Sequence, residues 1–171
     1  MSQYTSPVRG MSAENNKALV HRFYDEFYNG RDQSALDRYF ASDYVHHPAD
    51  LPTRRMDFAD FRKRALQYLD AFPDLSREIE DQVAEGDRVA TRSILRGKQE
   101  RDLPDLPSKG KQIEVRSIII YRIADGKIAE GWECYDSLSM MMQLEVIHMV
   151  STLSRAREEH TDFPHIREWP E

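Results

Sequence analysis

Acidic and aromatic residues gather at 132–136, where a predicted strand passes into a predicted helix: Trp132, Glu133, Tyr135 and Asp136. Side chains alternate between the two faces of a strand, so Glu133 is expected to share a face with Gly131 and Tyr135. A carboxyl group buried in an apolar cavity has a raised pKa and can remove a proton near neutral pH. Glu133 is therefore the candidate general base or acid, with Gly131 leaving room for a ligand and Tyr135 donating a hydrogen bond to it. A surface glutamate at the rim of the strand is the alternative.

Three further residues could take part in proton transfer. His46 and His47 are neighbours in an extended segment, so only one can point inward, where its imidazole could hydrogen-bond a substrate carbonyl or share a proton with Glu133. One exposed and one structurally bonded histidine is the alternative. The two side chains diverge and no third ligand is suggested, so we expect no metal site and no cofactor. Asp136 is a second candidate carboxylate, although an aspartate before Ser-Leu-Ser favours the N-cap of the following helix.

Other side chains are candidates for substrate binding. Arg92 lies in the middle of a predicted strand and could hold an anionic or enolate oxygen, although an outward-facing arginine is the favoured interpretation. Most aromatic residues at these spacings belong to a hydrophobic core, but some could form pocket walls. The aromatic candidates are Tyr24, Phe40, Tyr44, Phe61 and Trp132.

Two hairpins are predicted to position these residues. Residues 113–123 and 127–135 are rich in β-branched and aromatic residues, which is typical of strands, and Asp125-Gly126 between them favours a tight turn. Residues 76–84 and 88–97 predict an earlier pair of strands, also joined by a glycine-containing turn. The candidate site therefore follows the last strand of an antiparallel sheet.

Helices are predicted on the N-terminal side of this sheet. Apolar residues at helical spacing indicate a helix over 13–29, a short one after Asp32, and a third that begins at Asp57 and ends before Pro73. This order predicts an α+β fold, in which a cone-shaped, curved antiparallel sheet wraps around the N-terminal helices and leaves a cavity. The chain would then comprise a flexible tail over 1–12, a domain over 13–147, and a C-terminal helical extension and tail over 148–171.

Composition restricts the class of partner. The 171 residues carry a net charge of −6, which argues against nucleic acid as the main partner. The sequence has a single cysteine and no apolar run long enough to span a bilayer, so we expect a cytoplasmic protein that does not bind membranes. The basic run at 62–64 is interpreted as a solvated helix face.

Three motifs carry a resemblance to a known family: Phe-Pro-Asp-Leu at 72–75, Glu-Gly-Asp-Arg-Val-Ala at 85–90, and Tyr-Arg-Ile-Ala-Asp-Gly-Lys-Ile-Ala-Glu-Gly-Trp at 121–132. Together they resemble the SnoaL-like polyketide cyclases, whose fold is named for nuclear transport factor 2. The resemblance implies a cone-shaped pocket, usually in a homodimer, and cofactor-independent acid–base chemistry on polyketide-like, hydrophobic small molecules. It places the cyclase carboxylate, an aspartate in the family, at Glu133. It also places Ile119, a candidate pocket wall, where relatives carry a histidine.

Three functions remain open on the sequence alone. The first is a cyclase or isomerase that closes a ring by an intramolecular aldol or a related proton transfer. The second is another enzyme on the same scaffold, such as a dehydratase or an epoxide hydrolase, although Ile94 stands two residues after Arg92 where an epoxide hydrolase of this fold has an aspartate. The third is a non-catalytic protein that only binds a hydrophobic small molecule.

A homodimer is also predicted from the apolar run at 118–121. Helices can cover only one face of the sheet, whereas these residues are apolar on both, so the outer face needs a partner. The segment at 163–169 could cover that face instead.

Overall fold

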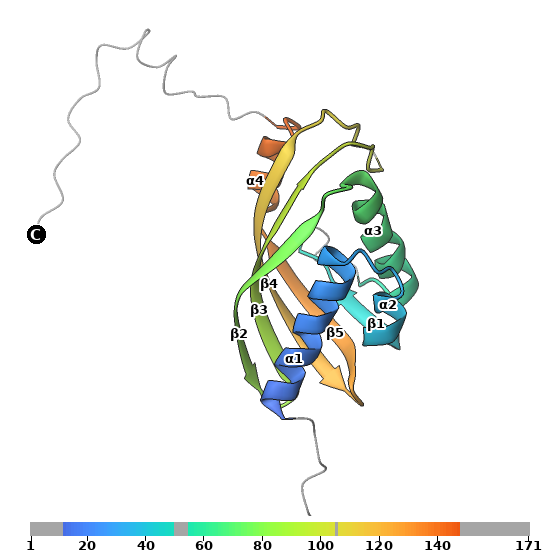
Figure 1. Ribbon diagram of the computed structural model, residues 1–171, viewed down its shortest axis with the longest axis vertical. Helices are drawn as coiled ribbons and strands as arrows, with labels where there is room; N and C mark the ends of the chain where they lie inside the picture. The colour runs from blue at the N-terminus through green and yellow to red at the C-terminus, as the bar shows by residue number, and fades with distance from the viewer. Residues whose placement is uncertain (1–11, 50–54, 105, 148–171) are drawn as a thin grey trace, which may run out of the picture.

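The computed structural model describes residues 12–49, 55–104 and 106–147 (Figure 1). The predicted C-terminal extension over 148–171 and the tail before residue 12 lie outside the described residues. The elements in chain order are α1 Ala13–Tyr24, the π-helical turn η1 Asp25–Asn29, α2 Ala35–Tyr39, β1 Phe40–His47, α3 Phe58–Ala71, β2 Ser76–Glu85, β3 Arg88–Lys98, β4 Gln112–Ala124, β5 Lys127–Tyr135 and α4 Ser137–Gln143.

The five strands form one curved, open sheet in the order β1-β5-β4-β3-β2. Neighbouring strands from β2 to β5 are antiparallel, whereas β1 pairs with β5 in parallel. Helices α1, α2 and α3 lie on one side of the sheet, and α4 follows β5 beside β4 (Figure 1). The predicted α+β fold with a curved antiparallel sheet is confirmed. The parallel β1–β5 pair was not predicted, and it brings the histidines of β1 beside β5.

Local sequence signals account for most of the element boundaries. The β4–β5 turn contains Asp125 and Gly126, both with positive φ, and the β2–β3 turn contains Gly86 with φ +57°. Asp57 caps α3 by accepting a hydrogen bond from the backbone N–H of Asp60 at 2.9 Å. The helix ends at Ala71, two residues before Pro73, as the sequence predicted.

The core is an aromatic cluster between the helices and the concave face of the sheet. Phe23 and Tyr24 of α1 and Phe27 of η1 are fully buried, and they contact Phe40 and Tyr44 of β1 directly or through one another. Tyr44 lies at the edge of this core and also lines the cavity.

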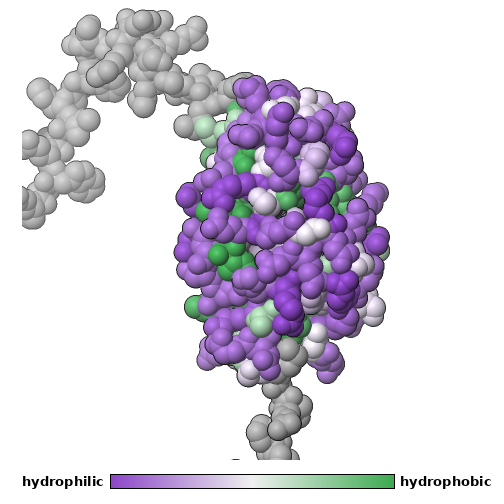
Figure 2. Space-filling model, in the orientation of Figure 1, coloured by the Kyte–Doolittle hydropathy of each residue, from purple (hydrophilic) through white to green (hydrophobic). Residues whose placement is uncertain are grey.

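The outer face of the sheet is partly apolar. Ile119 and Tyr121 point inward and are buried, whereas Ile118 is 49% exposed and Ile120 is 38% exposed. The outer face, which the sequence predicted to need a partner, is therefore partly exposed in the described part of the chain. The face of the molecule that Figure 2 shows is mostly hydrophilic. None of the described helices is long and apolar enough to cross a membrane.

Candidate active site

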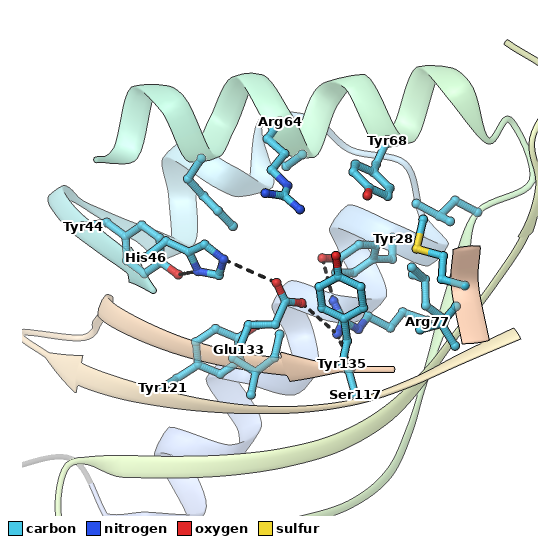
Figure 3. Close-up of a pocket in the computed structure, with 17 residues that line it drawn as sticks. Tyr28, Tyr44, His46, Arg64, Tyr68, Arg77, Ser117, Tyr121, Glu133 and Tyr135 are labelled. Carbon is cyan, nitrogen blue, oxygen red and sulfur yellow. Dashed lines mark hydrogen bonds and ion pairs between the residues drawn. The ribbon is translucent and has the colours of Figure 1, made fainter. Parts of the chain in front are cut away.

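A cavity of about 90 Å³ lies between α3 and the inner face of the sheet. Its apolar walls come from both layers and consist of Phe61, Ala65, Leu75, Leu95, Val115, Ile119 and Met140. Its polar groups concentrate at one place, where β5 passes under α3 (Figure 3). The cavity is thus lined mainly by apolar side chains, and its ionisable groups are concentrated in one part of the wall.

Glu133 lies at the centre of these polar groups. It pairs with Ile119 across the β4–β5 ladder, and alternation along β5 turns its side chain into the cavity together with Tyr135. The side chain is 19% exposed, with Oε2 lying 3.4 Å from His46 Nε2 and Oε1 lying 3.8 Å from a terminal nitrogen of Arg77. The carboxylate therefore sits between an imidazole and a guanidinium.

His46 is the inward member of the histidine pair. The parallel pairing of β1 with β5 places it opposite Gly131, and its ring is almost completely buried. Tyr44 Oη lies 3.0 Å from His46 Nδ1. Burial, and next the nearby Glu133 charge, raise the pKa of Tyr44 well above its usual value, so its hydroxyl is protonated. A tyrosine that donates to Nδ1 leaves the N–H on Nε2, the nitrogen that faces Glu133.

Gly131 serves a different purpose from the one expected. A Cβ atom at this position would lie 2.5 Å from Tyr44 Oη. The space that the glycine leaves is therefore filled by the tyrosine hydroxyl and not by a ligand. Gly131 allows Tyr44 to approach β5 closely enough to bond His46.

Arg77 of β2 is a site residue that the sequence reasoning missed. Its side chain is 4% exposed and lines the cavity on the side of Glu133 opposite His46 (Figure 3). The pairing of β2 with β3 shifts register between Ile79 and Asp81. The pairing is regular before this shift, so alternation places Arg77 on the same face as Ile79, which packs against the core. The apolar residue two positions later was the signal that could have identified Arg77.

Arg64 and Tyr68 of α3 also line the cavity, above Glu133 and Tyr135 (Figure 3). Their spacing of four residues places them on one face of the helix, beside the predicted apolar positions Phe61 and Ala65. The interpretation of the basic run at 62–64 as a solvated face is therefore corrected for Arg64. The helical spacing to Phe61 was the signal that could have identified it.

The expected rise in the pKa of Glu133 is also corrected. Burial does raise the pKa of this carboxyl, but the hydrogen bond from His46 and the positive charges of Arg77 and Arg64 outweigh it, so the pKa is lowered. The prediction assumed a wholly apolar cavity wall, and the wall contains cations. Glu133 is therefore an ionised carboxylate at neutral pH.

Three predicted site residues lie outside the cavity, on the outer face of the sheet. Arg92 forms ion pairs there with Asp81 and Glu80 at 2.9 and 2.6 Å, so it cannot hold a substrate oxygen. His47 and Trp132 stack on each other with ring centroids 5.2 Å apart. His47 Nε2 also lies 2.9 Å from Glu130. Alternation along β1 and β5 places His47 and Trp132 on the face opposite to His46 and Glu133.

The other predicted residues divide between site, core and cap. Phe61, Ile119 and Tyr135 line the cavity, whereas Tyr24 and Phe40 are buried in the aromatic core and do not line it. The Asp136 side chain accepts a hydrogen bond from the Ser139 backbone N–H at 2.9 Å, which makes it the N-cap of α4. In the described part of the chain, no group of His, Cys, Asp and Glu residues has the arrangement of a metal site.

Known proteins share this fold and this sequence pattern. AclR, a candidate hydroxylase from Streptomyces galilaeus, is 26% identical with a TM-score of 0.72, and the match covers 80% of this chain and 100% of AclR. TsrD from Streptomyces laurentii is 25% identical with a TM-score of 0.70, covering 81% and 100% of the two chains. IdmH, a candidate polyketide cyclase from Streptomyces antibioticus, is 28% identical with a TM-score of 0.66, covering 76% and 98%.

No curated protein matches the sequence significantly. The family model described as SnoaL-like polyketide cyclase matches residues 18–144, which include every strand and the whole candidate site. The match covers well over half of the chain and agrees with the structural neighbours. The chain therefore belongs to the SnoaL-like polyketide cyclase family.

Proposed function

We propose that the protein is a cofactor-independent acid–base enzyme of the cyclase or isomerase type, acting on a hydrophobic small molecule in the cavity. One observation carries the proposal: an ionised carboxylate, Glu133, faces a largely apolar cavity beside the imidazole of His46. A carboxylate whose only function was stability would gain more from water at the surface. Membership of the cyclase family, and the likeness to IdmH, support the same reaction class.

The proposed reaction begins with proton removal from carbon. Glu133 accepts a proton from the carbon next to a substrate carbonyl, and the C–H electron pair becomes part of an enolate. In a cyclase, the enolate carbon attacks a second carbonyl of the same molecule, so that one C–C bond forms and the second carbonyl oxygen becomes an alkoxide. Transfer of the proton from the Glu133 carboxylic acid to the alkoxide restores the site. In an isomerase, the proton returns to a different atom of the substrate.

The apolar walls determine what this site can accept. Phe61, Leu95 and Met140 contact the cavity from α3, β3 and α4, so the substrate is surrounded by elements that exclude water. Exclusion of water protects the enolate from protonation by solvent and holds the flexible chain folded for ring closure. A substrate with several carbonyl groups along an apolar chain fits these requirements.

Hydrogen exchange at carbon tests the proposal without the natural substrate. The wild-type protein should accelerate H/D exchange next to the carbonyl groups of β-diketones, followed by NMR. Glu133→Gln keeps the shape of the side chain but cannot accept the proton, and the rate should fall by about 10²- to 10⁴-fold.

Glu130→Gln is the matched control, because Glu130 lies on the same strand but pairs with His47 and Arg122 on the outer face. It should leave the exchange rate unchanged. Full activity in Glu133→Gln would place the base elsewhere. Tight binding of the diketones with no exchange in the wild type would instead indicate the non-catalytic binding protein.

We also propose that two copies of the chain pair through the outer face of the sheet. Val83, Ile118 and Ile120 are 69%, 49% and 38% exposed on that side, an apolar surface that a second sheet could bury. Light scattering should give the mass of a dimer for the wild type and of a monomer for Ile118→Lys. The control is Leu138→Lys, which changes an exposed apolar residue of α4. A wild-type monomer at micromolar concentration would contradict the pairing.

A further inference from the structure

Arg77 is a buried cation whose position is not explained by stability alone. Its side chain is 4% exposed, and it forms part of the cavity wall beside Glu133 (Figure 3). An arginine is always protonated in a protein, so a full positive charge is held away from bulk water. Burial of a charge is costly unless other groups compensate for it.

The hydrogen-bond acceptors of Arg77 among the described residues are neutral hydroxyl groups. Nε donates to Ser93 Oγ at 3.1 Å, and one terminal nitrogen donates to Tyr28 Oη at 2.9 Å. The other terminal nitrogen donates to Ser117 Oγ. Burial raises the pKa of Tyr28 to about 12 although the Arg77 charge lowers it, so the Tyr28 oxygen accepts as a neutral phenol. Hydroxyl acceptors orient the guanidinium but do not cancel its charge, as a bidentate carboxylate would.

Aromatic rings hold the guanidinium in place from the side of the core. The Arg77 Cζ atom lies 5.0 Å from the ring centroid of Tyr24 and 5.1 Å from that of Tyr28. Ser93 and Ser117, which both accept from Arg77, are also within hydrogen-bond distance of each other at 3.1 Å. The cation is therefore fixed before a ligand arrives, which is the condition for strong stabilisation of a charge that develops during a reaction.

The distance between Arg77 and Glu133 suggests which developing negative charge Arg77 stabilises. Glu133 Oε1 lies 3.8 Å from the terminal nitrogen of Arg77, which is beyond hydrogen-bond distance but close enough for both groups to reach one substrate unit. In a ketone, the carbonyl oxygen and the carbon that loses its proton are attached to the same carbon atom. A base and a cation separated by a few ångströms can therefore act on the two ends of that unit together.

We propose that Arg77 is the oxyanion-binding residue of the site, whose guanidinium holds the substrate carbonyl oxygen and the enolate oxygen that it becomes. This inference rests on the proposed function and names the group that the substrate must present. When Glu133 takes the proton, the C–H electron pair forms the C=C bond of the enolate and the negative charge moves to the oxygen at Arg77. When the enolate carbon forms its new bond, the C=O bond reforms and the charge leaves that oxygen. The second N–H of each terminal nitrogen provides the hydrogen bonds.

Phenols of graded acidity test this site without turnover, because a phenolate resembles an enolate in shape and charge. The probes are 4-nitrophenol and 3,4-dinitrophenol, whose ionised forms absorb visible light. The wild type should bind the phenolate in preference to the neutral phenol by at least tenfold, measured from absorbance titrations at several pH values. The preference should be lost in Arg77→Met and retained in Arg77→Lys.

Two further variants separate this inference from its alternatives. Ser117→Ala removes one of the hydroxyls that orient Arg77 and should weaken the preference for the anion about three- to tenfold, even if Arg77→Met does not fold. Arg92→Met removes an arginine of the outer face, paired with Asp81 and Glu80, and should change nothing. Glu133→Gln should bind phenolate more tightly than the wild type, because a negative charge next to the oxyanion has been removed.

Several results would overturn the inference. The wild type could fail to bind phenolate at millimolar concentration, or it could bind the neutral phenol alone. The preference for the anion could also be unchanged in Ser117→Ala and in any Arg77→Met protein that folds. Failure of the proposed function has a different signature. In that case phenolate would bind at Arg77 as described, but no variant would affect hydrogen exchange because the wild type would not catalyse it.

Discussion

The contact between Gly131 and Tyr44 supports a prediction that combines stability with activity. In Gly131→Ala, the new Cβ would lie 2.5 Å from Tyr44 Oη and 3.4 Å from Cζ of the same ring. The second distance is acceptable and the first is not, so the clash is with the hydroxyl group alone. Tyr44 must then move away from β5 by about 0.5 Å or more to reach a tolerable contact. This movement disturbs the 3.0 Å contact between Tyr44 Oη and His46 Nδ1.

The size of the effect follows from two contributions. Overpacking of a buried position costs about 1–3 kcal/mol of unfolding free energy. A buried hydroxyl that loses its hydrogen bond adds about 1 kcal/mol. Gly131→Ala should therefore lower the unfolding free energy by about 2–4 kcal/mol. It should also slow hydrogen exchange by roughly ten- to a hundredfold, because an imidazole displaced by a fraction of an ångström no longer orients Glu133.

A double-mutant cycle in urea denaturation tests the reasoning. Tyr44→Phe removes Oη, so the Cβ introduced by Gly131→Ala then meets two ring carbons, Cζ at position 44 and Cδ1 of Tyr121, each at the ordinary contact distance of 3.4 Å. In the Tyr44→Phe variant, Gly131→Ala should lower the unfolding free energy by less than about 1 kcal/mol. The coupling free energy between the two positions is then about 2 kcal/mol. The double mutant should have the low activity of Tyr44→Phe, because the bond to His46 is absent from both. An equal cost of Gly131→Ala with and without the hydroxyl would refute the clash as its cause.

Two further predictions concern the ionisable groups of β5 and the start of α4. The pKa of Glu133 in the folded protein is held below its ordinary value of 4.5, so its carboxylate stabilises the fold above that pH and the contribution is lost as the pH falls through the folded pKa. The difference in unfolding free energy between the wild type and Glu133→Gln, measured by urea denaturation from about pH 7 to about pH 3, should therefore shrink in acid, and a difference that grows would contradict the sign. Asp136→Ala should lower the unfolding free energy by about 1 kcal/mol through loss of the N-cap, whereas Asp136→Asn should be nearly neutral. Both Asp136 variants should keep the exchange activity, and loss of activity in Asp136→Asn would make Asp136 part of the site.

The sequence was most informative where short-range patterns determine the structure. Alternation after the Asp125-Gly126 turn predicted that Glu133 and Tyr135 share a face of β5, and both side chains line the cavity. Capping residues such as Asp57 acted as their local sequence indicated. These features depend on neighbours within a few positions, and long-range contacts do not alter them.

Residues whose roles depend on distant partners could not be predicted in this way. The hydroxyl groups that hold Arg77 come from three other elements, so its role in the site depends on residues far away in the sequence. The role of Gly131 depends on Tyr44, which reaches it only through a parallel strand pair between residues far apart in the chain. The direction of the Glu133 pKa shift depends on the balance between burial, which raises the pKa, and His46 and two arginines from different elements, which lower it. In each case, the prediction would have required knowledge of contacts between residues that are far apart in the sequence.

The same arginines that make Glu133 a weaker base also explain how it could serve as one. Burial raises the pKa of the Glu133 carboxyl, but the positive charges of Arg77 and Arg64 help to lower it by stabilising the carboxylate. When a proton moves from the substrate to Glu133, that charge moves by a few ångströms to the enolate oxygen, which on our proposal lies against Arg77. The positive groups then stabilise the enolate instead of the carboxylate, so their effect is carried forward along the reaction and is not lost. A site balanced in this way favours carbon acids whose own enolates are already moderately stable, such as a CH₂ group between two carbonyls, over simple ketones. The lowered pKa of the base and the buried arginine are therefore two consequences of one electrostatic arrangement, and both point to a substrate of the β-dicarbonyl kind.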